Sequence, residues 1–387
     1  MANVLLIGGG TQGLAIIRSL HKNGHRIIMT SSEQHNYGED SRYVSKKYIN
    51  GDIETESEDF LTYILDVIRK EQIDVIIPMG DLSALFISKN KDILSKKVKI
   101  KAPTIESFNN AYDKRKLMNL CHQNDYPHPE TIDMDEVDIN EDERLQSFHY
   151  PAMLKPNLTT GGRGMVKIES YSELKEKYPS LHEQYGIYHL QRFIPSGGKQ
   201  VKVQLYVDEK CQLLASSVMQ KLRWYPNDAG SSCCAMSINN PEVVELCHKV
   251  LKDLHWIGFA DFDLIEDPDT NELLIMEINP RIPACIKTAI AAGVDWAEVI
   301  VNDCLGLPQK KYGYKEGEYL RHLGFDILWF KNAKDRWHTN PSWFKFFGSH
   351  IHYQDMSGLT DPLPFLLGTW HNIKKLFSSD FKQAKGI

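Results

Sequence analysis

The chain has 387 residues, of which 42% are hydrophobic, so it is long enough for roughly two to three globular domains with sizeable cores. A net charge of −6 and a pI near 6.2 give no overall basic surface for nucleic acid. The N-terminal MANVLLIGGG lacks the features of a signal peptide, and no apolar run approaches the ~20 residues of a membrane span. We therefore expect a cytoplasmic globular protein that binds no nucleic acid and has no membrane span.

Cysteine usage agrees with a reducing compartment. The chain has 7 cysteines, an odd number, and no CxxC pair. Cys233 and Cys234 are neighbours that would form a disulfide only with strain. We expect reduced, mostly buried thiols.

The N-terminal third alternates between strand and helix patterns. Val4–Ile7 predicts a strand, Gly13–Leu20 an amphipathic helix and Arg26–Thr30 a second strand. The helix pattern of Glu58–Arg69, followed by the apolar run Asp74–Pro78, repeats this order. The first ~110 residues therefore predict a doubly wound parallel sheet with helices on both faces.

Glycines between the first strand and helix imitate a dinucleotide-binding fingerprint. Gly8, Gly10 and Gly13 meet the GxGxxG spacing, in which a pyrophosphate approaches a helix N-terminus. Glu33 is only a loosely placed acidic partner for a ribose. NAD binding stays an alternative, and we favour a tight turn or a substrate-domain loop.

From Tyr150 to Pro308 the pattern changes to short strands and hairpins interleaved with helices, which predicts an α+β body. The acidic segment Asp133–Glu143 before it predicts an exposed excursion. One helix is expected over Pro241–Leu254, with an apolar stripe of Val243, Cys247, Val250 and Leu254.

The segment from Gly258 to Arg281, GFADFDLIEDPDTNELLIMEINPR, predicts two antiparallel strands joined by a short loop. If the loop is centred near Thr270, Asp263 lies opposite Glu277. Strand alternation then places both carboxylates on one face with Asp261 and Asn279, where facing carboxylates repel unless a divalent cation bridges them. Carboxylate and amide oxygens suit Mg²⁺, and a solvated acidic face is the alternative. The other face is apolar, with Ala260, Phe262, Leu264, Leu274, Met276 and Ile278.

A lysine and a glycine-rich loop follow one another in YPAMLKPNLTTGGRGM. Tyr150–Lys155 is predicted to be extended because a residue before proline avoids the helical region, and Lys155 shares a face with Met153. The loop Thr159–Gly164 can turn backbone N–H groups toward phosphate oxygens. It does not match the GxxxxGK[ST] motif, and a flexible turn with a surface lysine is the alternative.

Three further positions carry candidate chemistry. His189–Pro195 ends a strand whose backbone can meet an adenine edge, although taken alone it is only a strand end. Lys221 and Arg223 lie on one face of an extended run and can meet phosphate or a substrate carboxylate, or form a solvated face. The Arg281 guanidinium, stiffened by neighbouring prolines, suits a carboxylate or acyl phosphate.

The order of these motifs resembles the ATP-grasp superfamily over roughly residues 1 to 308. The resemblance is carried by Asp113-Lys114, by Lys155 with TTGGRGM, by QRFI, by the acidic strand and by MEINPR. Within the superfamily the chain looks most like stand-alone carboxylate–amine ligases related to the carbamoyl-phosphate synthase large subunit and to D-aspartate ligase. The resemblance implies an N-terminal doubly wound pre-ATP-grasp domain, without NAD, followed by a two-lobed ATP-grasp body.

The resemblance also implies roles for single residues. Lys114 and Lys155 would contact the phosphates of ATP, and Asp263, Glu277 and Asn279 would hold Mg²⁺. Arg281 would stabilise an acyl phosphate, and we group Lys221 and Arg223 with it as candidate catalytic residues. The implied lid comprises Thr160, Gly161, Gly162, Gly164 and Met165, and the implied adenine hinge comprises Gln191, Arg192, Phe193 and Ile194. Arg192 stands where the family often has glutamate, and Asp263 replaces a commoner glutamate.

We divide the chain into a Rossmann-like domain (1–112), a small lobe with the glycine-rich lid (113–188), a large lobe with the Mg²⁺ and ATP site (189–310) and a C-terminal extension (311–387). The expected function is ADP-forming ligation of a small-molecule carboxylate to an amine, of amino-acid or peptide-like type, and a homodimer is one assembly that we consider. A non-catalytic ATP-binding protein and an NAD-dependent oxidoreductase are the alternatives. Substrate contacts are expected from Gly10–Gln12, Met79–Leu82 and Lys221–Ser232.

The C-terminal extension contains one helical pattern, in which Leu366, Trp370, Ile373 and Phe377 recur with Lys374 and Lys375 beside them. Such a basic amphipathic helix can associate weakly with a membrane surface. We favour the alternative, in which the stripe packs on the body or on a second subunit.

Overall fold

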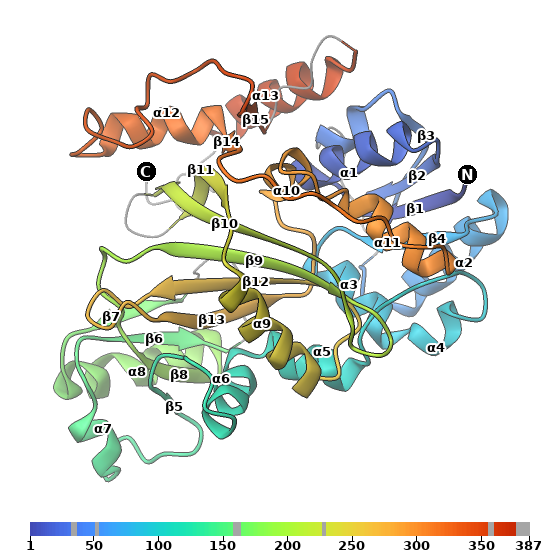
Figure 1. The fold of residues 1–387 in the computed structure, drawn as a ribbon. Coiled ribbons are helices and arrows are strands. Elements are labelled where there is room, and N and C mark those ends of the chain that lie inside the picture. The colour runs from blue at the N-terminus through green and yellow to red at the C-terminus, as the bar shows by residue number, and fades with distance from the viewer. Residues whose placement is uncertain (32–36, 51–53, 158–163, 227–229, 355–359, 377–387) are drawn as a thin grey trace. The chain divides into compact units, whose positions relative to one another are not determined.

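The computed structural model describes residues 1–31, 37–50, 54–157, 164–226, 230–354 and 360–376 (Figure 1). The chain forms two compact units. The first unit consists of Met1–Phe108, Lys202–Asp261 and Asn279–Ile387, and the second consists of Asn109–Val201 and Phe262–Ile278. Both units are assembled from separate stretches of the chain, whereas the division made from the sequence uses consecutive ranges.

Strands and helices alternate through the described part of the chain. The strands are β1 (Asn3–Ile7), β2 (Arg26–Ser31), β3 (Val44–Ile49), β4 (Val75–Pro78), β5 (Thr131–Asp133), β6 (Ala152–Pro156), β7 (Val166–Ile168), β8 (Tyr188–Arg192), β9 (Gln200–Val207), β10 (Leu213–Tyr225), β11 (Ser231–Ile238), β12 (Gly258–Glu266), β13 (Leu273–Asn279), β14 (Tyr319–Arg321) and β15 (Ile351–Tyr353). The helices are α1 (Gly10–Lys22), η1 (Tyr37–Asp40), α2 (Glu58–Glu71), α3 (Asp81–Lys89), α4 (Lys91–Leu94), α5 (Ile105–Tyr112), α6 (Lys114–Gln123), α7 (Glu143–Ser147), α8 (Tyr171–Tyr185), α9 (Pro241–Asp253), α10 (Ile286–Ala291), α11 (Trp296–Leu305), α12 (Leu323–Asn332) and α13 (Leu363–Leu376).

The first unit begins with a parallel sheet in the order β3-β2-β1-β4 (Figure 1). Alternate residues of β1 enter two cores: Val4 and Leu6 pack with α1 and α11, and Leu5 and Ile7 pack with α2 and α3. The sheet is therefore covered on both faces, which is why its central strand is apolar throughout. This confirms the doubly wound parallel sheet predicted from the sequence.

A larger sheet has the strand order β13-β12-β9-β10-β11-β14-β15. Within the first unit, β10 pairs antiparallel with β11, β11 with β14, and β14 runs parallel to β15. Helix α9 begins at Pro241, with Asn240 as its N-cap, and buries the predicted stripe of Val243, Cys247, Val250 and Leu254. The strand-and-helix body predicted after the parallel sheet is thus confirmed.

The second unit has its own antiparallel sheet in the order β5-β8-β6-β7. Its core contains Leu154 of β6, Leu190 of β8 and Leu174 of α8. The acidic segment 133–143 is mostly exposed as expected, but Asp133 and Met134 at its start are buried. Asp133 is the last residue of β5, and the Met134 N–H after it donates to the Tyr188 carbonyl at 3.1 Å.

The hairpin of β12 and β13 forms as predicted, with Ala260, Phe262, Leu264, Leu274 and Ile278 buried and Met276 only partly so. At its loop the Asp267 N–H donates to the Glu272 carbonyl at 2.9 Å, and Asn271 adopts a left-handed φ of 59°. A register continued unchanged from this pair would set Asp263 opposite Met276. Direct facing of Asp263 and Glu277 therefore stays a prediction.

Candidate active site

Lys155 lies on β6, in register with His189 of the neighbouring strand β8. Its Nζ donates to the Gln191 Oε1 at 2.5 Å, and the Gln191 Nε2 donates to the Thr131 Oγ1 at 3.1 Å. Burial lowers the pKa of Lys155 to about 8, with Glu277 acting to raise this pKa and Lys114 to lower it further. Lys155 is therefore a cation held at a cost by its surroundings, which an anion would stabilise.

His189 entered the sequence analysis only as the first residue of a strand end, yet it lies beside Lys155 and is fully buried. Its Nδ1 lies 2.7 Å from the Oδ1 of Asn157. Burial and the nearby Lys155 hold its pKa well below the usual value, so the ring is neutral. The signal available in the sequence was its position two residues before Gln191, which places both side chains on one face of the strand.

Lys114 is the first residue of α6, whose N-cap Asp113 accepts from the N–H groups of Arg115 and Lys116. The Lys114 Nζ lies 3.4 Å from a carboxylate oxygen of Glu277, the predicted metal ligand on β13. Arg115 pairs with Asp133 of β5 at 3.0 Å, which fixes the start of α6 on the sheet. The second unit thus brings a predicted phosphate-binding lysine to a predicted metal-binding carboxylate.

The predicted adenine hinge lies at and just beyond the end of β8. The N–H groups of Arg192 and Phe193 already donate to the carbonyls of Glu130 (2.9 Å) and Pro151 (3.2 Å). Arg192, one of the two departures from the family pattern, pairs through Nη2 with Asp267 at 2.5 Å. This arginine lowers the pKa of Asp267, so it serves to hold the loop of the β12–β13 hairpin.

Most of the predicted lid, including Thr160, Gly161 and Gly162, lies outside the described residues. Gly164, which follows them, has a φ of +73°, and its carbonyl accepts from the Tyr188 hydroxyl at 3.0 Å. A Cβ at this position would lie 2.9 Å from the Cγ of Pro156. The loop therefore returns to the sheet at a position that requires glycine.

Asp263 and Glu277, both partly exposed, belong to the second unit, and Asn279 belongs to the first. Among the described residues no three or more His, Cys, Asp or Glu side chains gather into a metal site. Hard carboxylate oxygens at Asp263 and Glu277 nevertheless fit Mg²⁺, which commonly takes one or two carboxylates and completes its shell with water and phosphate oxygens.

In the first unit Arg281 lies beside the predicted substrate loop Met79–Leu82. Its Nε is 2.9 Å from the Oδ1 of Asp81, the first residue of α3. The Gln12 Nε2 donates to the Met79 carbonyl at 3.1 Å, which joins the two N-terminal loops expected to contact substrate. The guanidinium of Arg281 is thus already engaged with a carboxylate.

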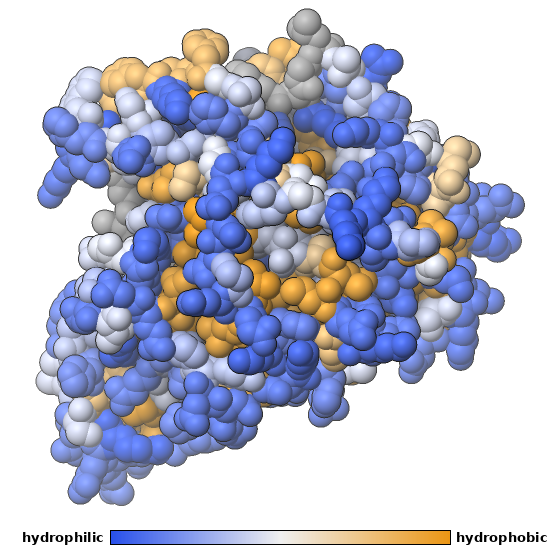
Figure 2. All heavy atoms as spheres, in the orientation of Figure 1, coloured by the Kyte–Doolittle hydropathy of each residue, from blue (hydrophilic) through white to orange (hydrophobic). Residues whose placement is uncertain are grey.

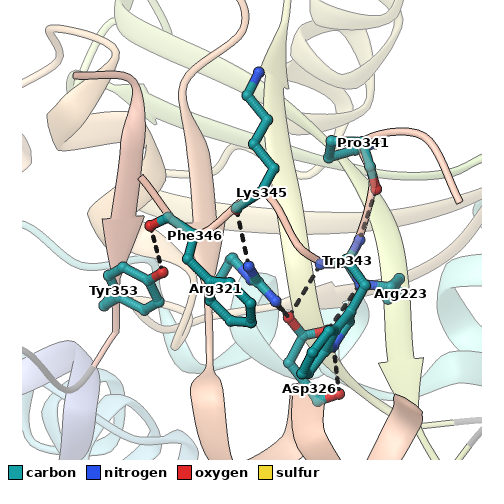
Figure 3. A network of polar contacts seen from close by, with 8 residues as sticks. All are labelled: Arg223, Arg321, Asp326, Pro341, Trp343, Lys345, Phe346 and Tyr353. Atoms are coloured by element: carbon teal, nitrogen blue, oxygen red, sulfur yellow. Dashed lines mark hydrogen bonds and ion pairs between the residues drawn. The ribbon is translucent and has the colours of Figure 1, made fainter. Parts of the chain in front are cut away.

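Arg223, a candidate catalytic residue, has a different environment from the one expected (Figure 3). It is 3% exposed, and its Nε and Nη2 donate to the two carboxylate oxygens of Asp326 at 2.7 and 3.0 Å. Arg321 shares this carboxylate at 2.7 Å. With its donors used inside the protein, Arg223 is better interpreted as a structural residue, while Lys221, two residues before it on β10, stays a candidate.

Comparison with known proteins agrees with this architecture. Residues 111–285 match the model of the ATP-grasp domain family. The chain is 23% identical over 291 residues to the carbamoyl phosphate synthase large chain of Thermoanaerobacter pseudethanolicus, covering 70% of this chain and 26% of that protein. The chain therefore spans about a quarter of the length of this relative.

Two solved structures share the fold. The biotin carboxylase domain of Hydrogenobacter thermophilus 2-oxoglutarate carboxylase, in complex with MgADP and bicarbonate, has a TM-score of 0.67 at 17% identity, over 82% of this chain and 73% of that chain. N5-carboxyaminoimidazole ribonucleotide synthetase from Thermotoga maritima has a TM-score of 0.59 at 16% identity, over 82% and 79%. Residues 111–285 thus match the ATP-grasp domain family, the same family that the sequence motifs resemble.

Proposed function

We propose that the protein is an ADP-forming ligase, which activates a small carboxylate as an acyl phosphate and joins it to an amine. One observation carries the proposal: the second unit gathers Lys114, Lys155 and Glu277 within a domain of the ATP-grasp family. Two lysines beside a metal-binding carboxylate suit the phosphates of a nucleotide, whose transfer depends mainly on positioning and charge stabilisation.

The lysines would bind the phosphates of ATP. Lys155 is preorganised by Gln191, and the neutral His189 beside it adds no competing positive charge. Lys114 would exchange its contact with Glu277 for a phosphate oxygen. Mg²⁺ bound through Asp263 and Glu277 would neutralise charge on the phosphates as the γ-phosphoryl group is transferred.

Arg281 would orient the acceptor carboxylate, in place of its contact with Asp81. A carboxylate oxygen takes the γ-phosphoryl group and ADP leaves. The amine nitrogen then attacks the acyl carbon, phosphate leaves with the C–O bond electrons, and the nitrogen loses a proton. Each turnover converts ATP to ADP and phosphate while one C–N bond forms.

The test is release of ADP and phosphate with amino acids and dipeptides as substrates, followed by nucleotide chromatography. Glu277→Gln should abolish ADP release and leave the melting temperature unchanged, because the side chain is partly exposed. Glu272→Gln, at an exposed position of the same hairpin, is the matched control. AMP with pyrophosphate as product, or unchanged turnover in Glu277→Gln, would contradict the proposal.

The two alternative functions are separated in the same assay. A non-catalytic protein would be stabilised by ATP·Mg²⁺ in a thermal shift but would release no ADP with any substrate. An oxidoreductase would be stabilised by NADH instead. The second unit favours the ligase, because Lys155 and Lys114 would have no role in a site formed by the glycines of the first unit.

A further inference from the structure

An aromatic surface stands out near the C-terminus of the first unit. It is formed by Ile327 of α12 and by Trp337, Phe344 and Phe347 in the segment after it, with exposures of 51%, 60%, 54% and 91%. Figure 2 shows hydrophobic residues at the surface over α12 and α13. A group of large apolar side chains exposed to solvent is typical of an interaction site.

This surface rests on a rigid base. Phe330 packs against the rings of Trp337, Trp343 and Phe344, with centroids 5.1, 4.2 and 5.7 Å away. The Trp343 Nε1 donates to the Asp326 carbonyl at 3.1 Å (Figure 3). The exposed rings are therefore preorganised by packing beneath them.

The buried arginines hold the same segment from below. Arg321 donates to the Lys345 carbonyl at 3.0 Å, and Arg223 donates to the Pro341 carbonyl at 3.3 Å (Figure 3). The Arg321 guanidinium also lies over the Phe346 ring, 4.4 Å from its centroid. The charged network thus fixes the backbone that presents the aromatic surface.

Helix α13 adds a second apolar stripe, and Leu366 and Trp370 of this stripe do not pack on the body of the protein. The helix packs inward through Gly368, against the Tyr37 ring, and Asp361 before it pairs with Arg18. Its outward face carries Leu363, Leu366, Leu367 and Trp370, with exposures of 50%, 57%, 36% and 59%. The predicted stripe therefore points to solvent at Leu366 and Trp370, and the Lys374 Nζ lies over the Trp370 ring at 5.4 Å.

The charges around these side chains are mostly positive. Lys331, Lys334, Arg336 and Lys345 lie among the exposed aromatic residues, against one exposed acid, Asp335. The α13 sequence contains lysines and no acid. This local excess of positive charge contrasts with the net charge of −6 of the whole chain.

We propose that this C-terminal surface docks the protein on an anionic lipid bilayer. Tryptophan and phenylalanine beside lysine and arginine are the side chains that bind at the interface of a membrane, where apolar burial and attraction to anionic headgroups add. A second copy of the chain is a poorer occupant, because a symmetric contact would bring the same basic residues together. The docking surface leaves the proposed ligase site unchanged in its chemistry.

Flotation of the full-length protein with vesicles tests the proposal. Vesicles of equal amounts of phosphatidylcholine and phosphatidylglycerol should carry the protein upward, those of phosphatidylcholine alone should not, and high salt should weaken binding. Phe347→Ser and Trp370→Ser should each lower the partition coefficient about tenfold. The double variant Lys331→Glu with Lys334→Glu should lower it at least roughly 20-fold.

Matched controls come from α4 and its C-terminal end, where Ile93 is 45% exposed and Lys96 and Lys97 lie close by in the sequence. Ile93→Ser, and Lys96→Glu with Lys97→Glu, should leave flotation unchanged. Absence of flotation of the unaltered chain, or an equal loss in these controls, would overturn the proposal. So would light scattering that shows a dimer abolished by Phe347→Ser without lipid, because the surface would then be a self-interface.

Discussion

Each unit contains a cluster of cationic side chains around a carboxylate. The two clusters differ in how many ion pairs their cations form and in how far their side chains are exposed to solvent. In the second unit, Lys155 and Lys114 lie near Glu277, whose side chain is 35% exposed. In the first unit, Arg223 and Arg321 grip Asp326, with all three side chains at most 3% exposed. A ligand can therefore reach the charges of the second-unit cluster, whereas the charges of the first-unit cluster are closed to solvent.

The comparison teaches that geometry decides which charges act on a ligand. The guanidinium groups of Arg223 and Arg321 donate hydrogen bonds to Asp326 and to backbone carbonyls, so these arginines stabilise the fold. Lys155 instead donates to the neutral amide of Gln191, and its burial lowers its pKa. We expect the first cluster to control stability and the second to control nucleotide binding.

The largest effect is expected from Asp326→Asn. The change leaves two buried arginines without their shared carboxylate and should cost about 3–5 kcal/mol of unfolding free energy. Denaturant unfolding measures this cost, with Asp335→Asn at an exposed position nearby as the control. If Asp326→Asn lowers the free energy of unfolding by less than about 1 kcal/mol, solvent reaches the arginines, and the two clusters do not differ in exposure as described.

Lys155→Met should have the opposite profile. Removing a preorganised cation from the transferring phosphates should lower kcat by about 10²–10³-fold. Stability should stay the same or rise, because the cost of burying the ammonium group disappears. Turnover and thermal melting measure the two effects, and Lys175→Met, at an exposed position of α8, is the control. Equal activity combined with lower stability would make Lys155 a structural residue.

Gly164→Ala should have a smaller effect, of about 1–3 kcal/mol in unfolding free energy, because strain at a φ of +73° adds to the contact with Pro156. Gly186→Ala, at a φ of +80° with open space around it, isolates the strain alone. Thermal melting of the two variants gives the difference. If they lose equal stability, the contact with Pro156 contributes nothing.

The pH dependence of ATP binding should show the smallest effect. The pKa of Lys155 is lowered to about 8, so the unbound lysine loses its proton above this pH, and phosphate must restore it on binding. Affinity for ATP should be constant below pH 8 and fall by up to about tenfold per pH unit above it.

The free energy of unfolding should change with pH in the opposite direction. Between pH 8 and the pKa of about 10.5 in the unfolded chain, stability rises with pH, because only the unfolded state keeps the proton on Lys155. Calorimetry in two buffers should detect proton uptake at pH 8, and Lys155→Met should abolish it.

Local patterns were enough to predict the regular elements that carry the candidate site. The apolar runs of β1 and β2, the capped helix α9 and the turn residues between β12 and β13 each contain their own signal. The edge strand β3, VSKKYI, was missed because its exposed lysines interrupt the apolar pattern.

What the sequence could not supply is pairing between distant positions. Arg223 meets Asp326 across about 100 residues, and nothing near either residue announces the partner. The position of His189 beside Lys155 likewise depends on the register of two strands. The stripe on α13 was visible as a period, but a period does not say which way an apolar face points.

The discontinuous second unit has a practical consequence for taking the protein apart. A gene fragment for residues 109–201 would encode Lys114 and Lys155 without the strands that bear Asp263 and Glu277, which lie in residues 262–278. A single cut within residues 202–261 would likewise divide the unit between two polypeptides. Neither of two complementary fragments should therefore bind nucleotide alone, whereas a mixture of both should. This makes the chain suited to split-protein complementation.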